Sequence, residues 1–157
     1  MQTFLPLPDF TQSFKVLDYR RLGKQRVETK QILKALGAYP VDLMSEEEAL
    51  RYEKKTKAGW GNHPATKMWK GYEQSLIVYH NECILEWVDR GYKNTMPLIP
   101  NTGTITDPSW LGDPSFHQSH RSNLIRKDPE YYRDQVGWTD PDDLDYIWPE
   151  GSTHEDV

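Results

Sequence analysis

The strongest structural signal in this chain is a long run of apolar residues at helical spacing between Pro64 and Gly91. Apolar side chains recur every three or four positions across this run, at Met68, Tyr72, Leu76, Tyr79, Cys83 and Val88. This period places them on one face of an α-helix and leaves the opposite face polar. Pro64 suits the first turn of a helix, and Gly91 suits its end. We therefore predict one central helix around which the rest of the chain must fold.

A second run of the same kind predicts a helix from about residue 11 to residue 36. Its apolar positions are Phe14, Leu17, Val27, Ile32, Leu33 and Leu36. Residues 1–10 contain two prolines and are expected to be extended, whereas Gly37 ends the helix. Gly23 interrupts the apolar stripe, so it marks a bend or a close approach of another backbone or a ligand.

The remaining segments complete the prediction of an all-α, compact single domain with three main helices and long irregular connections. The third helix is predicted over residues 115–127, and alternating strand patterns are scarce. Residues 45–58 read as a charged helical insertion, and residues 93–113 as a long glycine- and proline-rich connection. We expect the domain to comprise residues 1–150 and to be followed by an acidic flexible tail, residues 151–157.

Charge is divided unevenly along the chain, whose net charge is −5. Residues 128–157 carry ten Asp or Glu against one Arg, whereas residues 1–127 carry 18 Lys or Arg against 14 Asp or Glu. Seven of these cations lie within residues 15–34, which suits a polyanion-binding surface. A solvated helix face beside a solubilising tail explains the charge equally well. Residues 138–148 are expected to pack this acidic segment back on the domain.

The sequence shows no signal for secretion or membrane insertion. Its single cysteine, Cys83, cannot form an internal disulfide, and the first thirty residues contain no apolar run typical of a signal peptide. No stretch approaches the roughly 20 apolar residues that span a bilayer. We expect a cytoplasmic monomer that does not associate with membranes. Walker, dinucleotide-binding and cysteine-pair metal motifs are absent from the sequence, so no cofactor or metal is expected.

The basic first helix carries the first group of candidate catalytic residues. On a regular helix Arg21, Gln25 and Glu28 share one face, and Arg20 lies beside Lys24. A carboxylate among cations stays ionised and can stabilise a cationic sugar or activate a water, so Glu28 is the preferred catalytic group. Lys24 is a candidate amine nucleophile or phosphate contact. The alternative is an ordinary ion pair between Glu28 and Lys24.

His63 and a cluster on the third helix form the second group of candidates. His63 precedes a proline at a predicted helix start, where its ring could face a cleft and act in catalysis, or simply cap the turn. Further along the chain, two histidines three positions apart and a neighbouring arginine suit phosphate better than metal. The predicted phosphate-binding residues of this helix are His117, His120, Arg121, Asn123 and Lys127. The alternative is a polar helix surface without a ligand.

Several of these motifs together resemble the pyrimidine-dimer DNA glycosylase family of the phage endonuclease V type. They are Gln2-Thr3-Phe4-Leu5-Pro6, Asp18-Tyr19-Arg20, Arg21 through Glu28, Asn62-His63-Pro64, Met68-Trp69, Glu86 through Tyr92, and His117 through Tyr132. The resemblance implies an all-α domain that binds duplex DNA, kinks it and extrudes a nucleotide. It covers most of the chain outside the charged insertion and the last ten or so residues.

The resemblance also implies a catalytic α-amine on a small second residue and a glutamate directly after the Tyr-Arg pair. Gln2 and Arg21 occupy these two positions here, so Glu28 is considered as a relocated carboxylate and Lys24 as a relocated amine. Arg20 matches a phosphate-binding arginine of the family. The resemblance further suggests that Arg26 takes the place of a second one.

These observations predict a DNA base-excision N-glycosylase that flips a damaged or modified base out of duplex DNA. Gln2, Trp69 and Tyr72 are expected to read that base through its polar edge and its π face. AP lyase activity would follow if Lys24 forms an imine with the sugar. Two alternatives stay open: an enzyme acting on a free nucleotide or nucleoside, and a DNA-binding protein without catalysis.

Overall fold

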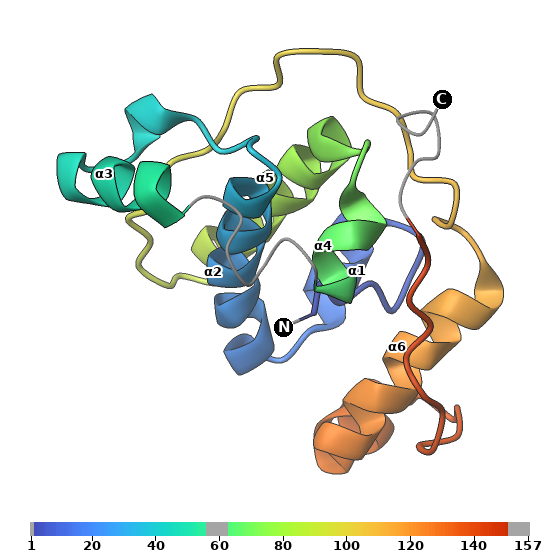
Figure 1. Ribbon diagram of the computed structural model, residues 1–157. Helices are drawn as coiled ribbons and strands as arrows, with labels where there is room; N and C mark the ends of the chain where they lie inside the picture. Colours follow the sequence, from blue (N-terminus) through green and yellow to red (C-terminus); the bar gives the residue numbers. More distant parts are fainter. Residues whose placement is uncertain (1, 56–62, 151–157) are drawn as a thin grey trace.

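The computed structural model describes residues 2–55 and 63–150 (Figure 1). Its helical elements, in chain order, are α1 (Phe10–Val16), α2 (Tyr19–Ala35), η1 (Val41–Leu43), α3 (Glu46–Lys55), α4 (Pro64–Trp69), α5 (Glu73–Asp89), α6 (Pro114–Lys127) and η2 (Glu130–Gln135). The described ranges contain no strand, and α2, α5 and α6 are the longest helices, which confirms the predicted all-α class. The tail predicted for residues 151–157 lies outside the described residues. None of the described helices has the length and apolar character that crossing a membrane requires.

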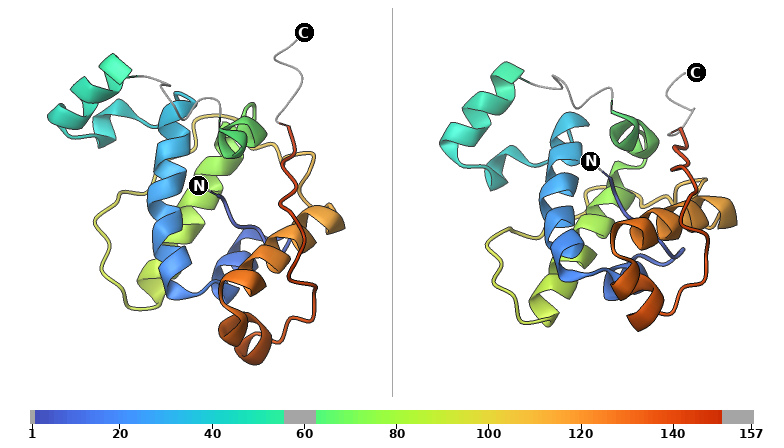
Figure 2. Two further views of the ribbon diagram at one scale, coloured as in Figure 1. Left: turned by 60° about the horizontal axis from the view of Figure 1, so that its bottom comes forward. Right: turned by 90° about the horizontal axis from the view of Figure 1, so that it is seen from below.

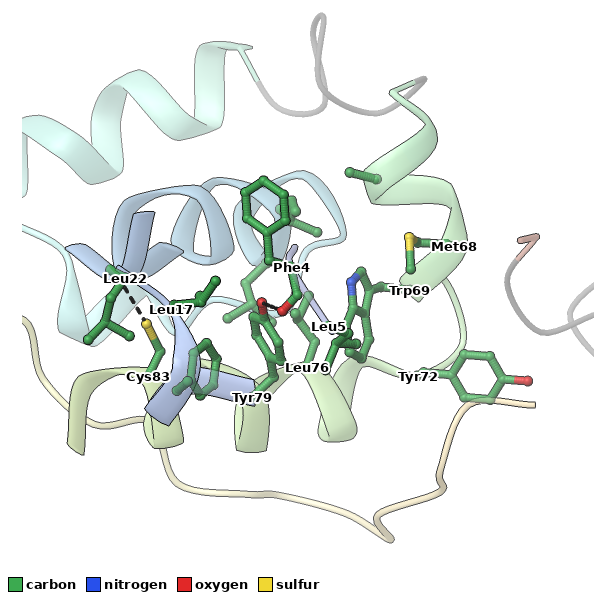
Figure 3. Packing of buried hydrophobic residues seen from close by; sticks show 14 of the residues in the cluster. Phe4, Leu5, Leu17, Leu22, Met68, Trp69, Tyr72, Leu76, Tyr79 and Cys83 are labelled. Carbon is green, nitrogen blue, oxygen red and sulfur yellow. Dashed lines mark hydrogen bonds between the residues drawn. The ribbon is translucent and has the colours of Figure 1, made fainter. Parts of the chain in front are cut away.

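Helices α2 and α5 pack against each other at the centre of the molecule. Gly23 allows this approach, because a Cβ added there would lie only 2.9 Å from the Trp87 ring of α5. Figure 3 shows the shared core, which also takes side chains from α1, α4 and the N-terminal segment. Cys83 is fully buried in it, and its Sγ lies 3.4 Å from the carbonyl oxygen of Leu22. Gly23 was predicted to mark a bend or a close approach of another backbone or a ligand, but the group that approaches it is a side chain, the Trp87 ring.

The single helix predicted for residues 11–36 is in fact two helices, α1 and α2. Leu17 ends α1 in an extended conformation, and Asp18 then caps α2 by accepting a hydrogen bond from the backbone N–H of Arg21. The carboxylate of Asp18 also accepts a hydrogen bond from the Tyr132 hydroxyl at 2.5 Å. A capping aspartate fixed from the far end of the chain outweighs the apolar periodicity that runs through this break.

The predicted central helix is likewise interrupted, between α4 and α5. Gly71 has a φ of 87°, a left-handed conformation that breaks a helix and that glycine adopts readily. The Glu73 carboxylate accepts a hydrogen bond from the Gly71 N–H at 3.0 Å and secures the new start. Helix α5 alone provides the long central element.

The N-terminal segment, residues 2–6, is extended as predicted and buried inside the molecule. It passes between α2, α5 and α6, and the side chains of Phe4 and Leu5 enter the core (Figure 3). This burial brings the beginning of the chain against α2. Packing in the core therefore fixes the position of Gln2.

Helix α6 is covered along one side by a strap, residues 138–150, which runs beside it without helical structure (Figure 2). The Leu144 N–H donates a hydrogen bond to the Ser122 hydroxyl at 3.0 Å, and the Ile147 N–H donates one to the Ser119 hydroxyl at 3.2 Å. These bonds confirm the expectation that the acidic segment packs back on the domain.

Helix α3 lies at the edge of the molecule in Figure 1, away from α6 and the strap. Glu48 attaches it to α2, because its carboxylate pairs with Lys30 at 2.8 Å and with Lys34 at 3.0 Å. This helix falls within the charged insertion predicted for residues 45–58. It takes no part in the cleft described below.

Candidate functional site

A cleft of about 1090 Å³ lies between the first three turns of α2 and the segment where α6 leads into η2. Phe4 and Gln2 of the N-terminal segment and Tyr146 of the strap complete its walls. The residues that line it are Gln2, Phe4, Asp18, Tyr19, Arg20, Arg21, Lys24, Gln25, Glu28, Lys127, Asp128, Glu130, Tyr131, Gln135 and Tyr146. The cleft therefore joins four parts of the chain, from Gln2 near its beginning to Tyr146 near its end.

Gln25 is the residue that connects the cleft to the core. Its Oε1 lies 3.1 Å from the Phe4 N–H and 2.8 Å from the Tyr79 hydroxyl. Its Nε2 donates to the carbonyl oxygen of Gln2 at 2.9 Å and to the Glu28 carboxylate at 3.0 Å. All the hydrogen-bonding groups of this buried amide are thus engaged. Gln25 fixes the N-terminal segment and Glu28 with respect to each other.

Glu28 lines the cleft and is half-buried. Its Oε2 accepts the bond from Gln25 and a second one from the backbone N–H of Gln2 at 3.3 Å. No salt bridge between Glu28 and Lys24 occurs among the described residues, so the alternative of an intrahelical ion pair is not what the structure has. Glu28 is instead an oriented carboxylate that is held by neutral donors and faces the cleft.

Cations and carboxylates share the outer part of the cleft. Arg20, Lys24 and Lys127 are exposed on its rim, as a contact with phosphate would require. Arg21 is partly neutralised, because its guanidinium lies 3.2 Å from the Asp18 carboxylate. The opposite wall carries carboxylates of its own, Asp128 and Glu130. The cations therefore follow α2 and the end of α6 rather than surround the whole opening.

Gln2 brings a side-chain amide with an unused donor to the cleft. Its Oε1 accepts a hydrogen bond from the Thr3 N–H at 2.8 Å, and this bond fixes the orientation of the amide. Its Nε2 is buried and has no hydrogen-bond partner within residues 2–55 and 63–150. Leaving a buried donor unsatisfied costs about 1–3 kcal/mol. A ligand that places a carbonyl oxygen at this position would remove the penalty.

Two residues predicted to bind phosphate, His117 and His120, point into the protein instead. Nδ1 of His117 donates to the carbonyl oxygen of Leu5 at 2.7 Å, since its Nε2 accepts from the Gly112 N–H at 2.9 Å. His120 has the other tautomer, and its Nδ1 accepts from the Leu5 N–H at 2.9 Å. The two rings together bind both backbone groups of Leu5. We name this pair the histidine clamp.

Burial keeps both rings of the histidine clamp neutral. It lowers the pKa of His117 and lowers the pKa of His120 to about 3. A neutral ring has no charge to offer a phosphate, and both side chains are almost fully buried. The structure therefore corrects the expectation of a phosphate-binding face at these two positions.

Arg121 and Asn123 of α6 also have internal partners. The Arg121 guanidinium pairs with Asp140 of the strap at 3.0 Å and donates to the carbonyl oxygen of Pro6 at 2.8 Å. The Asn123 amide donates to the carbonyl oxygen of Leu144 at 3.1 Å. These bonds hold the strap and the N-terminal segment on α6, so a phosphate contact is not supported for either residue.

Trp69 and Tyr72, which were expected to stack on a base, belong to the core in Figure 3. Trp69 is fully buried, and its indole N–H donates to the Thr3 hydroxyl at 3.0 Å. Tyr72 is 7 % exposed, and neither ring lines the cleft. Aromatic residues at helical spacing were thus core residues, and stacking on a base is not supported for them.

His63 and Arg26 also lie outside the lining of the cleft. The His63 ring caps α4 by accepting a hydrogen bond from the Ala65 N–H at 3.0 Å, and it packs edge-on against Trp148. Burial lowers the pKa of His63, while the nearby Glu28 carboxylate opposes this shift. Arg26 stacks on Trp87 on the adjoining surface, with 4.3 Å from its guanidinium carbon to the ring centroid.

The cleft brings together six of the predicted site residues: Gln2, Arg20, Arg21, Lys24, Glu28 and Lys127. Sequence reasoning did not predict Gln25 as the positioning residue, although a glutamine three positions before Glu28 on the inner side of a basic helix was an available signal. It also missed Tyr146 and Asp128. No local pattern singles these two out, because they reach the cleft only through the tertiary fold.

Comparisons with known proteins agree with the helical site. The family model for pyrimidine dimer DNA glycosylase matches residues 1–100. The matched part contains α2 and the N-terminal segment, which form one wall of the cleft and hold Glu28. No curated protein and no solved structure gave a significant match.

Proposed function

Because the chain belongs to the pyrimidine dimer DNA glycosylase family, we propose that it is a DNA N-glycosylase that removes a damaged or modified base by nucleotide flipping. The observation that carries the proposal is the position of Glu28. This carboxylate faces a cleft whose rim bears Arg20, Lys24 and Lys127, and its orientation is fixed by Gln25 and the N–H of Gln2. Cations on the rim can bind phosphates while the carboxylate acts on the sugar between them.

In the proposed reaction, the bond between C1′ of the deoxyribose and the base nitrogen breaks with both electrons going to the base. The positive charge that develops on the sugar is stabilised by the Glu28 carboxylate. The departing base takes up a proton from solvent and leaves as the neutral free base. A water then adds to C1′ and loses a proton to Glu28, which returns it to solvent, so the carboxylate is restored and one water is consumed. An abasic site is the product.

Lys24 offers a second route to the same bond cleavage. It lies one turn before Glu28 and lines the same cleft. Attack of its amine on C1′ would displace the base and give an imine after ring opening, which leads to AP lyase activity. Reduction with borohydride would trap this imine as a covalent complex with DNA. Absence of a trapped complex in an active preparation would exclude the lyase route and leave the hydrolytic one.

We assign base recognition to Gln2. Gln2 lines the cleft, and its buried Nε2 has no hydrogen-bond partner within the described residues, so the base should present a carbonyl oxygen to this amide. A base whose corresponding position carries an amino group would leave two donors facing each other. Discrimination by buried hydrogen-bonding groups of this kind is strong, because the wrong partner leaves them unpaired.

The test is mass spectrometry of the bases released from duplex DNA that contains a panel of damaged or modified nucleotides. We expect release of at least one base by the wild-type protein and a loss of about 10²–10⁴-fold for Glu28→Gln, with DNA binding retained. Glu130→Gln is the matched control, because this exposed carboxylate lines the same cleft from its opposite wall. Full activity of Glu28→Gln would refute the catalytic assignment.

The carboxylates Asp128 and Glu130 on the cleft wall favour one rival function, action on a free nucleoside or nucleotide. Carboxylates close to an opening disfavour a long phosphate backbone more than they disfavour a small substrate. A nucleoside and nucleotide pool incubated beside the DNA panel separates the two functions. Release of a base from the pool, without release from DNA, would replace the proposed substrate.

A further inference from the structure

A column of aromatic rings and guanidinium groups lies on the surface next to the cleft. Its members, in order, are Arg26, Trp87, Tyr92, Tyr19 and Arg20, and we call it the aromatic column. The rings of Trp87 and Tyr92 stack with their centroids 4.3 Å apart, and those of Tyr92 and Tyr19 lie nearly parallel at 6.2 Å. The guanidinium carbon of Arg26 lies 4.3 Å from the Trp87 centroid, and that of Arg20 lies 5.7 Å from the Tyr19 centroid.

The inner end of the column is held rigidly. Gly23 leaves room for the Trp87 ring against α2, and the indole N–H of Trp87 donates to the carbonyl oxygen of Lys93 at 2.9 Å. Arg26 is fixed by Asn94, whose side-chain oxygen accepts a hydrogen bond from the guanidinium at 2.8 Å. These contacts position the rings before any ligand arrives.

The outer end of the column is open and cationic. Tyr19 is 50 % exposed and Tyr92 is 40 % exposed, although both are large aromatic side chains. Arg20 and Arg26 form no salt bridge within the described ranges 2–55 and 63–150. The two oxygens that accept hydrogen bonds from Arg26, those of the Gly23 carbonyl and the Asn94 side chain, are neutral. Trp87 and Tyr92 have neighbours on both sides within the column, so a further planar group can be added only at its Tyr19–Arg20 end. There the half-exposed Tyr19 ring lies beside a guanidinium that donates a hydrogen bond to the Tyr19 hydroxyl and forms no salt bridge in the described ranges.

We propose that the aromatic column is a stacking site for an unpaired nucleobase that flanks the nucleotide held in the cleft. Tyr19 and Arg20 belong to both the cleft lining and the column, so a strand that leaves the cleft reaches the open end of the column directly. A base stacks on an aromatic side chain through its π face whatever its sequence, and a guanidinium beside it can bind the phosphate. The inference rests on the proposed action on DNA and extends it to a second contact, outside the reaction centre.

The inference predicts a preference for DNA that is locally unpaired beside the target. In an intact duplex the flanking base is already stacked on its neighbours, whereas a kinked or frayed duplex offers a free face. Binding should therefore be tighter when one nucleotide next to the target has no partner in the opposite strand. The base-reading residue Gln2 is not involved in this preference.

The test uses a duplex with one unpaired 2-aminopurine next to the target, whose fluorescence falls when the base stacks. We expect quenching on binding of the wild-type protein and about tenfold weaker binding for Tyr92→Leu and for Tyr19→Leu. Tyr92→Phe should bind as the wild type does, because the π face is kept. Val27→Ala is the matched control, since this valine is exposed on the same helix outside the column.

Base release measured at saturating DNA separates the column from the reaction. If both leucine variants bind the unpaired duplex as tightly as the wild type while Glu28→Gln abolishes release, the stacking site is refuted and the proposed function stands. If the wild-type protein neither binds DNA nor releases a base from it, both proposals fall. For Tyr92→Leu, whose ring does not line the cleft, weaker binding with unchanged urea unfolding and unchanged release at saturation supports the stacking site.

Discussion

Helices α2 and α6 each have a face dense in polar residues, but the two faces have different roles. The α2 face leaves Glu28, Lys24 and Arg20 facing the cleft. The α6 face directs His117 and His120 onto the backbone of Leu5. One face is open to a ligand, and the other holds the protein together.

The difference lies in what satisfies the polar groups. On α6 the partners are backbone groups of two segments without regular structure, the N-terminal segment and the strap, which have no ladder partners of their own. On α2 the partners of Gln25 are internal, whereas Arg20 and Lys24 on the cleft rim are exposed to solvent and accessible to an anion. The polar side chains of a helix that packs against irregular backbone therefore form hydrogen bonds with that backbone. Only a polar helix face that is open to solvent remains available to bind a ligand.

Replacing Gln25 should have the largest effect on stability. This residue lies on the polar face of α2, but its partners are internal, like those of the polar residues of α6. Gln25→Leu removes the acceptor of the Phe4 N–H and the donor to the Gln2 carbonyl oxygen. We expect the free energy of unfolding to fall by about 3–5 kcal/mol, measured by urea denaturation. Gln135→Leu, an exposed glutamine of the same cleft, should leave stability within about 0.5 kcal/mol of the wild type. Equal stability of both variants would show that the amide network is unimportant.

Breaking the histidine clamp should reduce stability rather than affinity for DNA. His120→Leu leaves the Leu5 N–H without its acceptor, and we expect a loss of about 2–3 kcal/mol in the free energy of unfolding. DNA affinity, measured at a temperature where the variant is fully folded, should stay within about twofold of the wild type. Unchanged stability together with weakened DNA binding would restore the phosphate-binding role expected from the sequence.

Acidification should lower the free energy of unfolding, because protonation of a clamp histidine is incompatible with its buried position. Burial lowers the folded-state pKa of His120 to about 3, against about 6.5 in the unfolded chain. Outside the clamp, burial also lowers the pKa of His80, a fully buried residue of α5, to about 4. Below pH 6.5 the unfolded state takes up protons that the folded state does not, so stability must fall as pH falls, down to the folded-state pKa values.

Urea midpoints at pH 7 and pH 5.5 measure this loss. His120→Gln removes one of the titrating rings, so its loss between the two pH values should be smaller than that of the wild type by about 1 kcal/mol. Identical losses in the two proteins would mean that His120 does not titrate as its burial requires.

The smallest effects on stability are expected on the open face. Lys24→Ala and Lys127→Ala should each change the free energy of unfolding by less than about 0.5 kcal/mol, since both side chains are exposed. Each should lower the salt dependence of DNA binding by about one phosphate contact and weaken binding severalfold. Lys67→Ala, an exposed lysine outside the cleft, is the control. If neither cleft variant changes the salt dependence of DNA binding, these lysines do not contact DNA.

The sequence was sufficient where local chemistry decides the structure. The all-α class and the α6 helix after Asp113 follow from apolar periodicity and capping. The size of Gly23 indicated a close approach, but not that the approaching group is the Trp87 side chain. The placement of Glu28 beside Arg21 and Gln25 follows from helical spacing alone.

The sequence was insufficient where distant parts of the chain decide. The break before Asp18 depends on Tyr132, and the tautomers of the histidine clamp depend on Leu5 and Gly112. Periodicity along one helix contains no information about such partners. Tyr146 reaches the cleft for the same kind of reason, because the strap that carries it is positioned by hydrogen bonds to α6.

The bond between Leu5 and His120 also sets an order of events in the cell. These residues are 115 positions apart, and a ribosome adds roughly 5–20 residues per second, so Leu5 waits roughly 6–23 s for His120 to be made. Throughout that interval the N-terminal segment can dock on α2 and α5 but lacks its third support. The burial of the N-terminal segment, and with it the part of the cleft wall that Gln2 and Phe4 form, is therefore complete only after translation has passed α6.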